Sequence, residues 1–209
     1  MKTISQTLVA LFALLCWTSA SAQSNFGEFR WGLKAGANFA SVNNLSNDVE
    51  KDKGKVGFVG GAFCKIPLKH YVSIRPELLF HTKGATLDIP TDVTGQRYTG
   101  RYATNYIELP LSIDFDLPFF LDLHVGVQGA VLLSKKLTVD GSAVKDPENF
   151  NSSEFGWHIG GGIDLGNIGI HLRFQQSLTS FYDTFLMGAG NVEPRNWGLA
   201  LTASYMFVN

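Results

Sequence analysis

A strict alternation of apolar and polar residues runs through residues 119–135, FFLDLHVGVQGAVLLSK. Every second side chain from Leu121 to Leu133 is apolar or glycine, whereas the residues between them include Asp122, His124 and Gln128. Because successive side chains of a strand point to opposite faces, a period of two predicts a strand, and no helix places such residues on one stripe. The run exceeds the ~5–6 residues of an ordinary globular strand. It suffices for the ~9–11 tilted residues that cross a bilayer.

Seven further segments repeat this pattern, with apolar side chains or glycine at every second position. They are residues 30–39, 55–64, 72–81, 106–115, 155–165, 168–177 and 197–207. Bacterial outer-membrane barrels have an even number of strands, with apolar side chains toward lipid and polar ones toward the lumen. The sequence therefore predicts an all-β chain that forms an eight-stranded antiparallel up-and-down transmembrane β-barrel.

The links between the segments alternate in length. The short links contain Pro67, Pro118 and Gly166-Asn167. The long, polar links are residues 41–54, 85–101, 136–153 and 183–195. Outer-membrane barrels have short periplasmic turns and long extracellular loops, and a soluble β-sandwich has no reason to segregate its connections in this way.

The first residues have the pattern of an export signal. Lys2 supplies a basic start, residues 8–17 an apolar core, and Ala20-Ser21-Ala22 a small-residue cleavage site. The apolar core is too short to span a membrane as a helix. We therefore predict a signal peptide over residues 1–22 and an outer-membrane barrel domain over residues 23–209, located in the outer membrane of a bacterial cell.

The composition agrees with a lipid-facing protein. The 209 residues carry a formal net charge of −1, and 17% of them are charged. A nucleic-acid binder usually shows a strong basic excess, so no nucleic-acid partner is expected. The charged fraction lies below the ~25% of typical soluble domains, which is expected if outer-membrane lipid covers much of the surface.

Aromatic residues lie near the ends of the predicted strands, where barrels carry girdles at the two membrane interfaces. The residues assigned to these girdles are Trp31, Tyr71, Tyr106, Phe119, Trp157, Trp197, Tyr205 and Phe207. The main alternative is a soluble eight-stranded ligand barrel, whose apolar face would point inward. The nearly charge-free apolar face and the export signal favour the membrane.

Charged and imidazole side chains crowd one half of the predicted lumen. Counting from the short links places these residues in the periplasmic half: Arg75, Glu77, Glu108, Asp122, His124, Asp164, His171 and Arg173. An eight-stranded barrel is barely wide enough for its own side chains, so buried charges must pair across it. We interpret the set as a structural polar plug in which Glu108 pairs with Arg75 or Arg173. A proton or small-ion path through these charges is one alternative, and an acid–base pair for hydrolysis is another.

No pattern indicates catalysis, a cofactor or a metal. The five histidines are dispersed, without the His-x-x-x-His pair that would suggest zinc. No serine lies in a Gly-x-Ser-x-Gly turn, and Gly160-Gly161-Gly162 lacks the strand–helix context of a phosphate loop. We therefore expect a protein that is not an enzyme.

Four segments carry a family resemblance. They are residues 32–39 (GLKAGANF), 106–111 (YIELPL), 155–162 (FGWHIGGG) and 173–178 (RFQQSL). Together they resemble the PorT-like outer-membrane β-barrel family of Bacteroidetes, over nearly all of the mature chain. The resemblance implies an eight-stranded outer-membrane barrel. It implies no single activity, although the name-giving member serves protein secretion.

The sequence leaves three roles open. The favoured role is a structural or surface-interaction barrel whose long loops meet extracellular partners. The second is an accessory component of a protein secretion system, which would contact secretion-machinery proteins. The third is a narrow solute or ion pore.

Overall fold

The computed structural model describes residues 29–43, 50–90, 97–139, 142–144, 151–180, 185–186, 191–192 and 195–207. The predicted signal peptide, residues 1–22, lies outside the described residues. Within the described ranges, no helix is long and apolar enough to span a membrane.

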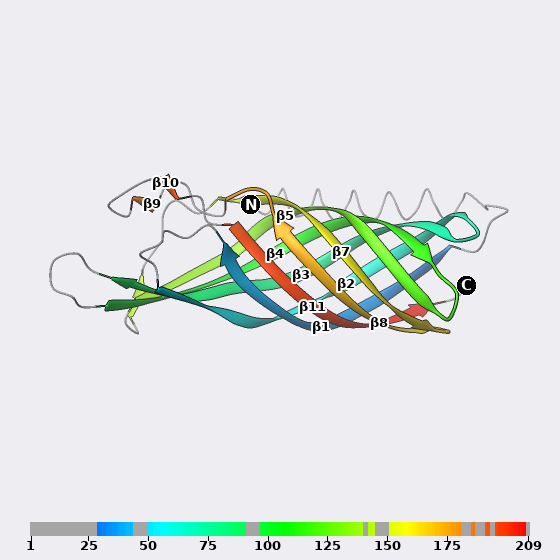
Figure 1. Ribbon diagram of the computed structural model, residues 1–209, viewed down its shortest axis with the longest axis horizontal. Helices are drawn as coiled ribbons and strands as arrows, with labels where there is room; N and C mark the ends of the chain where they lie inside the picture. Colours follow the sequence, from blue (N-terminus) through cyan, green and yellow to red (C-terminus); the bar gives the residue numbers. More distant parts are fainter. Residues whose placement is uncertain are drawn as a thin grey trace.

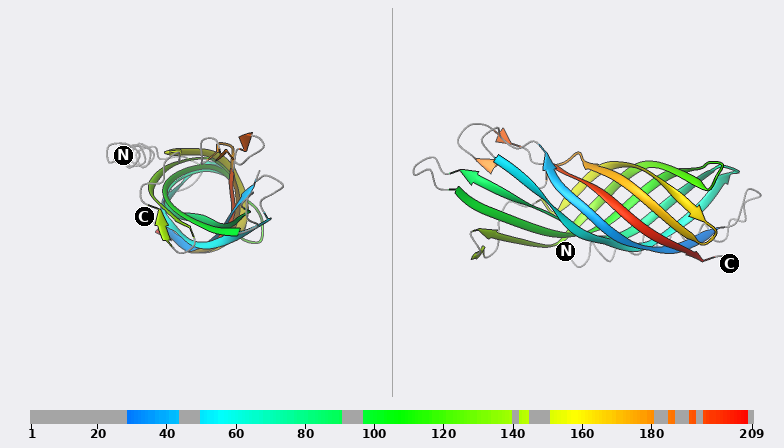
Figure 2. Two further views of the ribbon diagram at one scale, coloured as in Figure 1. Left: turned by 90° about the vertical axis from the view of Figure 1, so that its left-hand side faces the viewer. Right: turned by 60° about the horizontal axis from the view of Figure 1, so that its bottom comes forward.

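Eight long strands close into one antiparallel barrel (Figure 1). They are β1 (Arg30–Asn43), β2 (Glu50–Lys69), β3 (Val72–Pro90), β4 (Arg97–Asp116), β5 (Leu121–Val139), β7 (Ser153–Leu165), β8 (Ile168–Ser177) and β11 (Arg195–Phe207). Each strand pairs with the next of these eight, and β11 pairs with β1, so the sheet forms the ring seen end-on in Figure 2. The predicted fold class is confirmed.

Burial alternates along the barrel strands as the sequence predicted. On β5, Leu121 and Leu123 are exposed, whereas Asp122 and His124 are buried. Around the ring, large apolar side chains dominate the exposed set and polar side chains the buried set, which is the reverse of the burial in a soluble protein. This is the arrangement of a barrel whose wall contacts lipid.

Three links predicted as long loops, residues 41–54, 85–101 and 136–153, contain strand in their described parts, which corrects the sequence expectation there. The strand residues are 41–43, 50–54, 85–90, 97–101, 136–139, 142–144 and 153. The β2–β3 ladder continues to Glu50 and Asp88, and the β3–β4 ladder to Pro90 and Arg97. A strand surrounded by water on both faces needs no apolar alternation, because backbone hydrogen bonds alone maintain the ladder. Polar composition therefore concealed these strand segments.

The strands β2 to β5 project beyond the rest of the barrel at the end that carries the long links (Figure 1). The β1–β2 ladder stops at Ala40 and Lys55, and the β5–β7 ladder at Val131 and Ser153. We name the projecting residues the sheet extension; they are residues 50–54, 86–90, 97–101 and 137–139. The short strand β6 (Ser142–Val144) pairs with β5 in the extension. Strands β9 (Phe185–Leu186) and β10 (Asn191–Val192) form a separate two-stranded hairpin.

The opposite end of the barrel carries three short turns, at residues 70–71, 117–120 and 166–167. This is the periplasmic end in the outer-membrane layout. Gly166 has a φ of +62°, which glycine adopts without strain. Phe119 and Phe120 both have a φ of +64°, a left-handed conformation that is disfavoured for bulky side chains.

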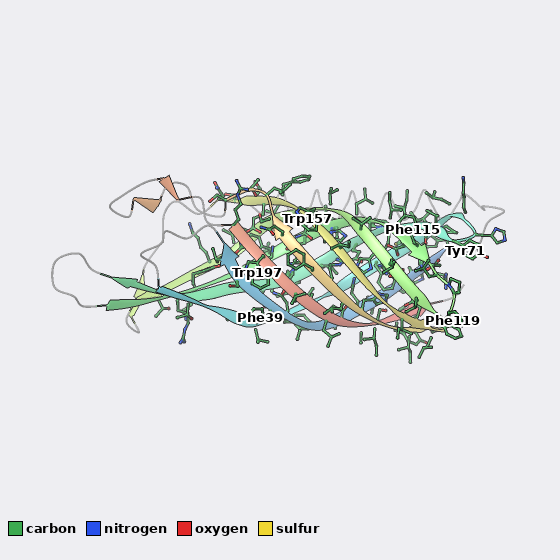
Figure 3. The ribbon with its side chains drawn as sticks, in the orientation of Figure 1. Phe39, Tyr71, Phe115, Phe119, Trp157 and Trp197 are labelled. Carbon is green, nitrogen blue, oxygen red and sulfur yellow. The ribbon has the colours of Figure 1, made fainter. Side chains whose placement is uncertain are left out.

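Aromatic side chains form a band across four neighbouring strands of the wall, at the level where the sheet extension begins. Phe39, Trp197, Phe174 and Trp157 lie on β1, β11, β8 and β7, and their successive ring centroids are 6.1, 6.2 and 5.6 Å apart. Figure 3 shows Phe39, Trp157 and Trp197 at this level. We name this set the outer aromatic band. It occupies the position of a membrane interface girdle.

A second band lies near the short turns. Trp31 stacks on Phe207 with centroids 4.3 Å apart, and Tyr205 lies 5.1 Å from Phe207. Tyr106, which the sequence assigned to a girdle, is instead fully buried. Its position on β4 points inward, toward the Lys83 ammonium 4.9 Å from the ring centroid.

Candidate functional site

Charged side chains fill the lumen next to the short turns. We name them the inner cluster; its members are Lys34, Lys65, Arg75, Glu77, Asp114, Asp122, His124, Asp164, His171 and Arg173. They come from β1, β2, β3, β4, β5, β7 and β8. Four basic side chains face four carboxylates, so the cluster is close to electrically neutral. Neutrality of this kind limits the cost of burying charge in a narrow barrel.

Glu77 is the central carboxylate of the inner cluster and is fully buried. It accepts two hydrogen bonds from the Arg173 guanidinium, of 2.7 and 2.8 Å, and a third of 2.8 Å from the Lys34 ammonium. Arg75 Nε lies 3.4 Å from the same carboxylate. Because β3 and β8 lie on opposite sides of the ring, the bidentate pair of Glu77 and Arg173 crosses the lumen.

A second group of ion pairs lies at the periplasmic mouth. The Lys65 ammonium is 2.5 Å from Asp116, 3.7 Å from Asp164 and 3.8 Å from Asp122. Arg75 Nη2 lies 3.3 Å from the Asp122 carboxylate. These contacts join β2, β3, β4, β5 and β7, so the mouth is closed by side chains that hold five strands together.

A small apolar layer lies next to the inner cluster, on its extracellular side. Val59, Leu79 and Ala200 are 2–3% exposed and pack against one another. On β3 the inward order is Glu77, Leu79, His81, so on this side of the lumen the layer lies between two polar levels. A cavity of about 10 Å³ lies at this level, between the layer and Arg173. It has room for about one water molecule.

A second polar group lies beyond the apolar layer. We name it the outer cluster; its members are His81, Lys83, Tyr102, Glu108, Glu154 and Asn196. The Lys83 ammonium donates to Glu154 at 3.0 Å and lies 2.6 Å from Glu108. His81 Nδ1 lies 2.7 Å from the Glu108 carboxylate. The Tyr102 hydroxyl donates to Asn196 at 3.1 Å and links the opposite strands β4 and β11.

The structure brings seven of the eight predicted plug residues together in the inner cluster. Glu108 is the exception, and the prediction that it pairs with Arg75 or Arg173 is wrong. The β3–β4 register sets Glu108 opposite Leu79, at the level of the apolar layer, so its partners lie on the extracellular side. Strand tilt and register decide the level at which Glu108 lies in the lumen, and neither can be obtained by counting residues from the turns.

Several charged members of the two clusters were not assigned from the sequence. Lys34 and Asp114 lie on the polar face of their predicted segments, so the alternation was a sufficient signal for both. Lys65, Lys83 and Glu154 lie one or two residues outside the predicted segments. Extending the period of two by a single residue pair would have placed all three in the lumen.

Asp122, His124 and His171 place potential metal-ligand atoms within 4.8 Å of one another. The Arg173 guanidinium donates to His124 Nε2 at 3.3 Å, so His124 Nδ1 carries the ring proton and donates to Asp122 at 3.1 Å. Arg75 lies against the same Asp122 oxygen. A divalent ion would have to displace this proton, and the positive charge of two guanidinium groups would repel it. The three residues therefore fit a hydrogen-bonded network better than a metal centre.

We expect excess Zn²⁺ to leave the urea midpoint of the folded barrel unchanged. An ion that binds the folded state alone would raise the midpoint by mass action. The measurement is urea unfolding in phospholipid vesicles with and without Zn²⁺. A zinc-dependent rise that disappears in the His171→Ala variant would contradict the network interpretation.

Comparisons with known proteins agree with this fold. Residues 21–183 match the family model for the outer membrane protein beta-barrel domain. Neisserial surface protein A has a TM-score of 0.51 at 12% identity, covering 85% of this chain and 97% of that chain. OprG from Pseudomonas aeruginosa has a TM-score of 0.50 at 8% identity, covering 86% and 96%. No curated protein matches the sequence.

Identities this low establish the fold alone, whereas the family model spans most of the chain. The apolar wall, the closed ring and the two aromatic bands agree with that match. The predicted localisation is therefore confirmed. The chain belongs to the outer membrane protein beta-barrel domain family and is a small eight-stranded barrel of the bacterial outer membrane.

Proposed function

We propose that this protein is a closed scaffold that presents its sheet extension to partners outside the cell. The observation that carries the proposal is the continuation of β2 to β5 beyond the ends of the β1–β2 and β5–β7 ladders. Ordering backbone outside the bilayer costs conformational entropy, and a barrel that only spans the membrane does not need it. A surface used for recognition would be a physical reason to keep these strands long.

The filled lumen supports a scaffold over a pore. Ion pairs cross the ring in the inner cluster, hydrogen bonds cross it in the outer cluster, and the apolar layer lies between them. An ion moving through would have to lose hydration and disrupt the ion pairs and hydrogen bonds that cross the lumen. The polar clusters therefore act as structural plugs in this proposal.

We expect no discrete single-channel steps when the purified barrel is inserted into planar bilayers. The physical reason is that buried side chains of the two clusters and of the apolar layer fill the lumen of the described barrel. A general porin in the same bilayers is the positive control. Reproducible unitary currents from the folded protein would favour the solute or ion pore instead.

The role of the sheet extension can be tested by shortening the β3–β4 hairpin. Thr86 pairs with Arg101, so joining these two residues through an Asn-Gly turn preserves the register below them. We expect the shortened barrel to fold, as judged by heat-modifiable gel mobility, while its strain reproduces the phenotype of a full deletion. A matched strain carries Asn167→Gly in the opposite turn and should behave as wild type. A shortened strain without the deletion phenotype would count against the surface role.

The PorT-like segments favour a second candidate, an accessory role in protein secretion in a Bacteroidetes bacterium. Comparison of secreted proteins between wild-type and deletion strains tests this candidate. An unchanged set of secreted proteins eliminates it. We also propose that the mature chain begins at Gln23, which intact-mass measurement tests, and that the protein is not an enzyme and uses no cofactor.

A further inference from the structure

We propose that the outward face at the base of the sheet extension is a binding site for a diphosphorylated glycolipid of the lipid A type. Three cations form the site, and they lie on β2, β4 and β5, which continue into the sheet extension (Figure 1). We name them the basic triad; they are Lys55, Arg101 and Lys136. The outer aromatic band covers β1, β7, β8 and β11, so the triad lies on the other half of the wall. This inference does not depend on any protein partner of the sheet extension.

The strand register places Arg101 and Lys136 on the outer face of the sheet. The β4 residues Tyr102 and Thr104 are buried. Arg101 and Ala103 alternate with them and therefore point outward. Ala103 pairs with Lys136, which shares its face, and both Arg101 and Lys136 are exposed. The two cations are diagonal neighbours on adjacent strands, about 7–8 Å apart, so their long side chains can reach one ligand.

Lys55 reaches the same surface from β2, across a glycine. Gly84 pairs with Ala103 and so lies on the outer face of β3. A Cβ atom at Gly84 would lie 3.1 Å from Lys55 Cδ, so the lysine stem crosses β3 where there is no side chain. Gly84 and Ala103 form a shallow floor among the three cations. A phosphate group can approach the backbone closely at such a floor.

The surroundings of the basic triad are polar but not acidic. The adjacent row of outward residues on the membrane side is Thr82, Asn105 and Ser134. The Asn105 amide donates a hydrogen bond of 2.8 Å to the Ser134 hydroxyl. Across the described ranges, no residue forms an ion pair with a member of the triad. The first acidic residues in the ladder, Asp88 and Glu50, come one row farther from the membrane than Arg101. Cations without a protein counterion attract an anionic ligand.

The basic triad lies at the level of lipid headgroups. The last large outward apolar residues on β3, β4 and β5 are Phe80, Ile107 and Leu133. Rows two residues apart along a strand are separated by about 7 Å. The headgroup region on each side of a bilayer is about 5–8 Å deep. Because barrel strands are tilted, the cations lie about one headgroup thickness above the last apolar row. The acyl chains of a bound lipid can therefore pack against that row.

The number of cations favours a glycolipid with two phosphates over a phospholipid. A phosphatidylglycerol headgroup carries one negative charge, which a single cation can neutralise. Lipid A carries two phosphate groups and forms the outer leaflet of bacterial outer membranes, at the end of the barrel that carries the long links. Clustered lysine and arginine side chains recognise multiply charged lipid headgroups, and arginine can form two hydrogen bonds to one phosphate.

The first experiment measures the lipid preference of the purified full barrel by native mass spectrometry in a neutral detergent. The probes are diphosphoryl lipid A and phosphatidylglycerol. We expect one diphosphoryl lipid A to bind per barrel, about tenfold more tightly than phosphatidylglycerol, because it engages more than one cation. Equal affinities for the two probes would overturn the proposal, since they would show only a general attraction of anionic lipids.

The second experiment locates the site. The double variant Arg101→Gln/Lys136→Gln removes two cations from the outer face and leaves the lumen unchanged. We expect it to bind diphosphoryl lipid A about 30-fold more weakly than the wild type, because two cations beside the phosphates are lost. The matched control Arg30→Gln/Lys69→Gln removes the same charge near the short turns and should keep the wild-type affinity. Unchanged affinity in the first variant, or an equal loss in both variants, would overturn the site.

Discussion

Glu77→Ala is expected to lower the free energy of unfolding by about 3–5 kcal/mol, because it leaves buried cations without their carboxylate. Glu77 is hydrogen-bonded to Arg173 and Lys34 and lies beside Arg75. All three cations are at least 94% buried, so water cannot replace the lost partner. The measurement is reversible urea unfolding in phospholipid vesicles, followed by tryptophan emission.

The control for this prediction is Asp116→Ala at the periplasmic mouth. The Asp116 side chain is 38% exposed, and its partner Lys65 keeps Asp122 and Asp164 nearby. A partly exposed pair of this kind contributes about 0–1 kcal/mol. Adding Lys34→Met to Glu77→Ala should recover part of the loss, because it removes one unpaired cation. A Glu77→Ala barrel as stable as the control would mean that the inner cluster does not hold the strands together.

Leu201→Arg is expected to destabilise the barrel by about 2–4 kcal/mol, since it places a charge near the middle of the lipid-facing wall. Leu201 is 55% exposed and lies midway along β11 between Trp197 and Tyr205, which belong to the two aromatic bands. The arginine side chain is therefore as far as possible from either interface. The same urea titration in vesicles measures the effect.

The control for Leu201→Arg is the same substitution at a different depth in the membrane. Leu178 is 47% exposed and follows the end of β8, past the outer aromatic band. The same substitution there should cost about 0–1 kcal/mol, because the charge reaches water. Equal losses at Leu201 and Leu178 would show that the two aromatic bands do not mark the membrane interfaces.

The inward and outward faces were predictable for most strand residues, because a strand alternates its side chains with a period of two. Glu77 and Arg173 were assigned to the lumen on this basis, and both are buried there. Their mutual pairing was not predictable, since β3 and β8 face each other across the lumen only when the ring closes. The same limit explains Glu108, whose level in the lumen follows from the β3–β4 register.

The sheet extension shows a second limit of sequence patterns. Residues 86–90 and 97–101 pair through their backbones, and nothing in their side chains has to alternate for that pairing to form. The outer-membrane layout predicted loops there. Only the neighbouring ladders reveal that the strands continue past the bilayer.

The sequence by itself determined that this chain is an outer-membrane barrel, because hydrophobic periodicity is a local property that each strand carries alone. It also determined which side chains face lipid. The tertiary structure alone decided which lumen charges meet, where the apolar layer lies beside them, and how far β2 to β5 project. These features depend on tilt, register and closure, which are properties of the whole ring and arise from pairing between distant strands.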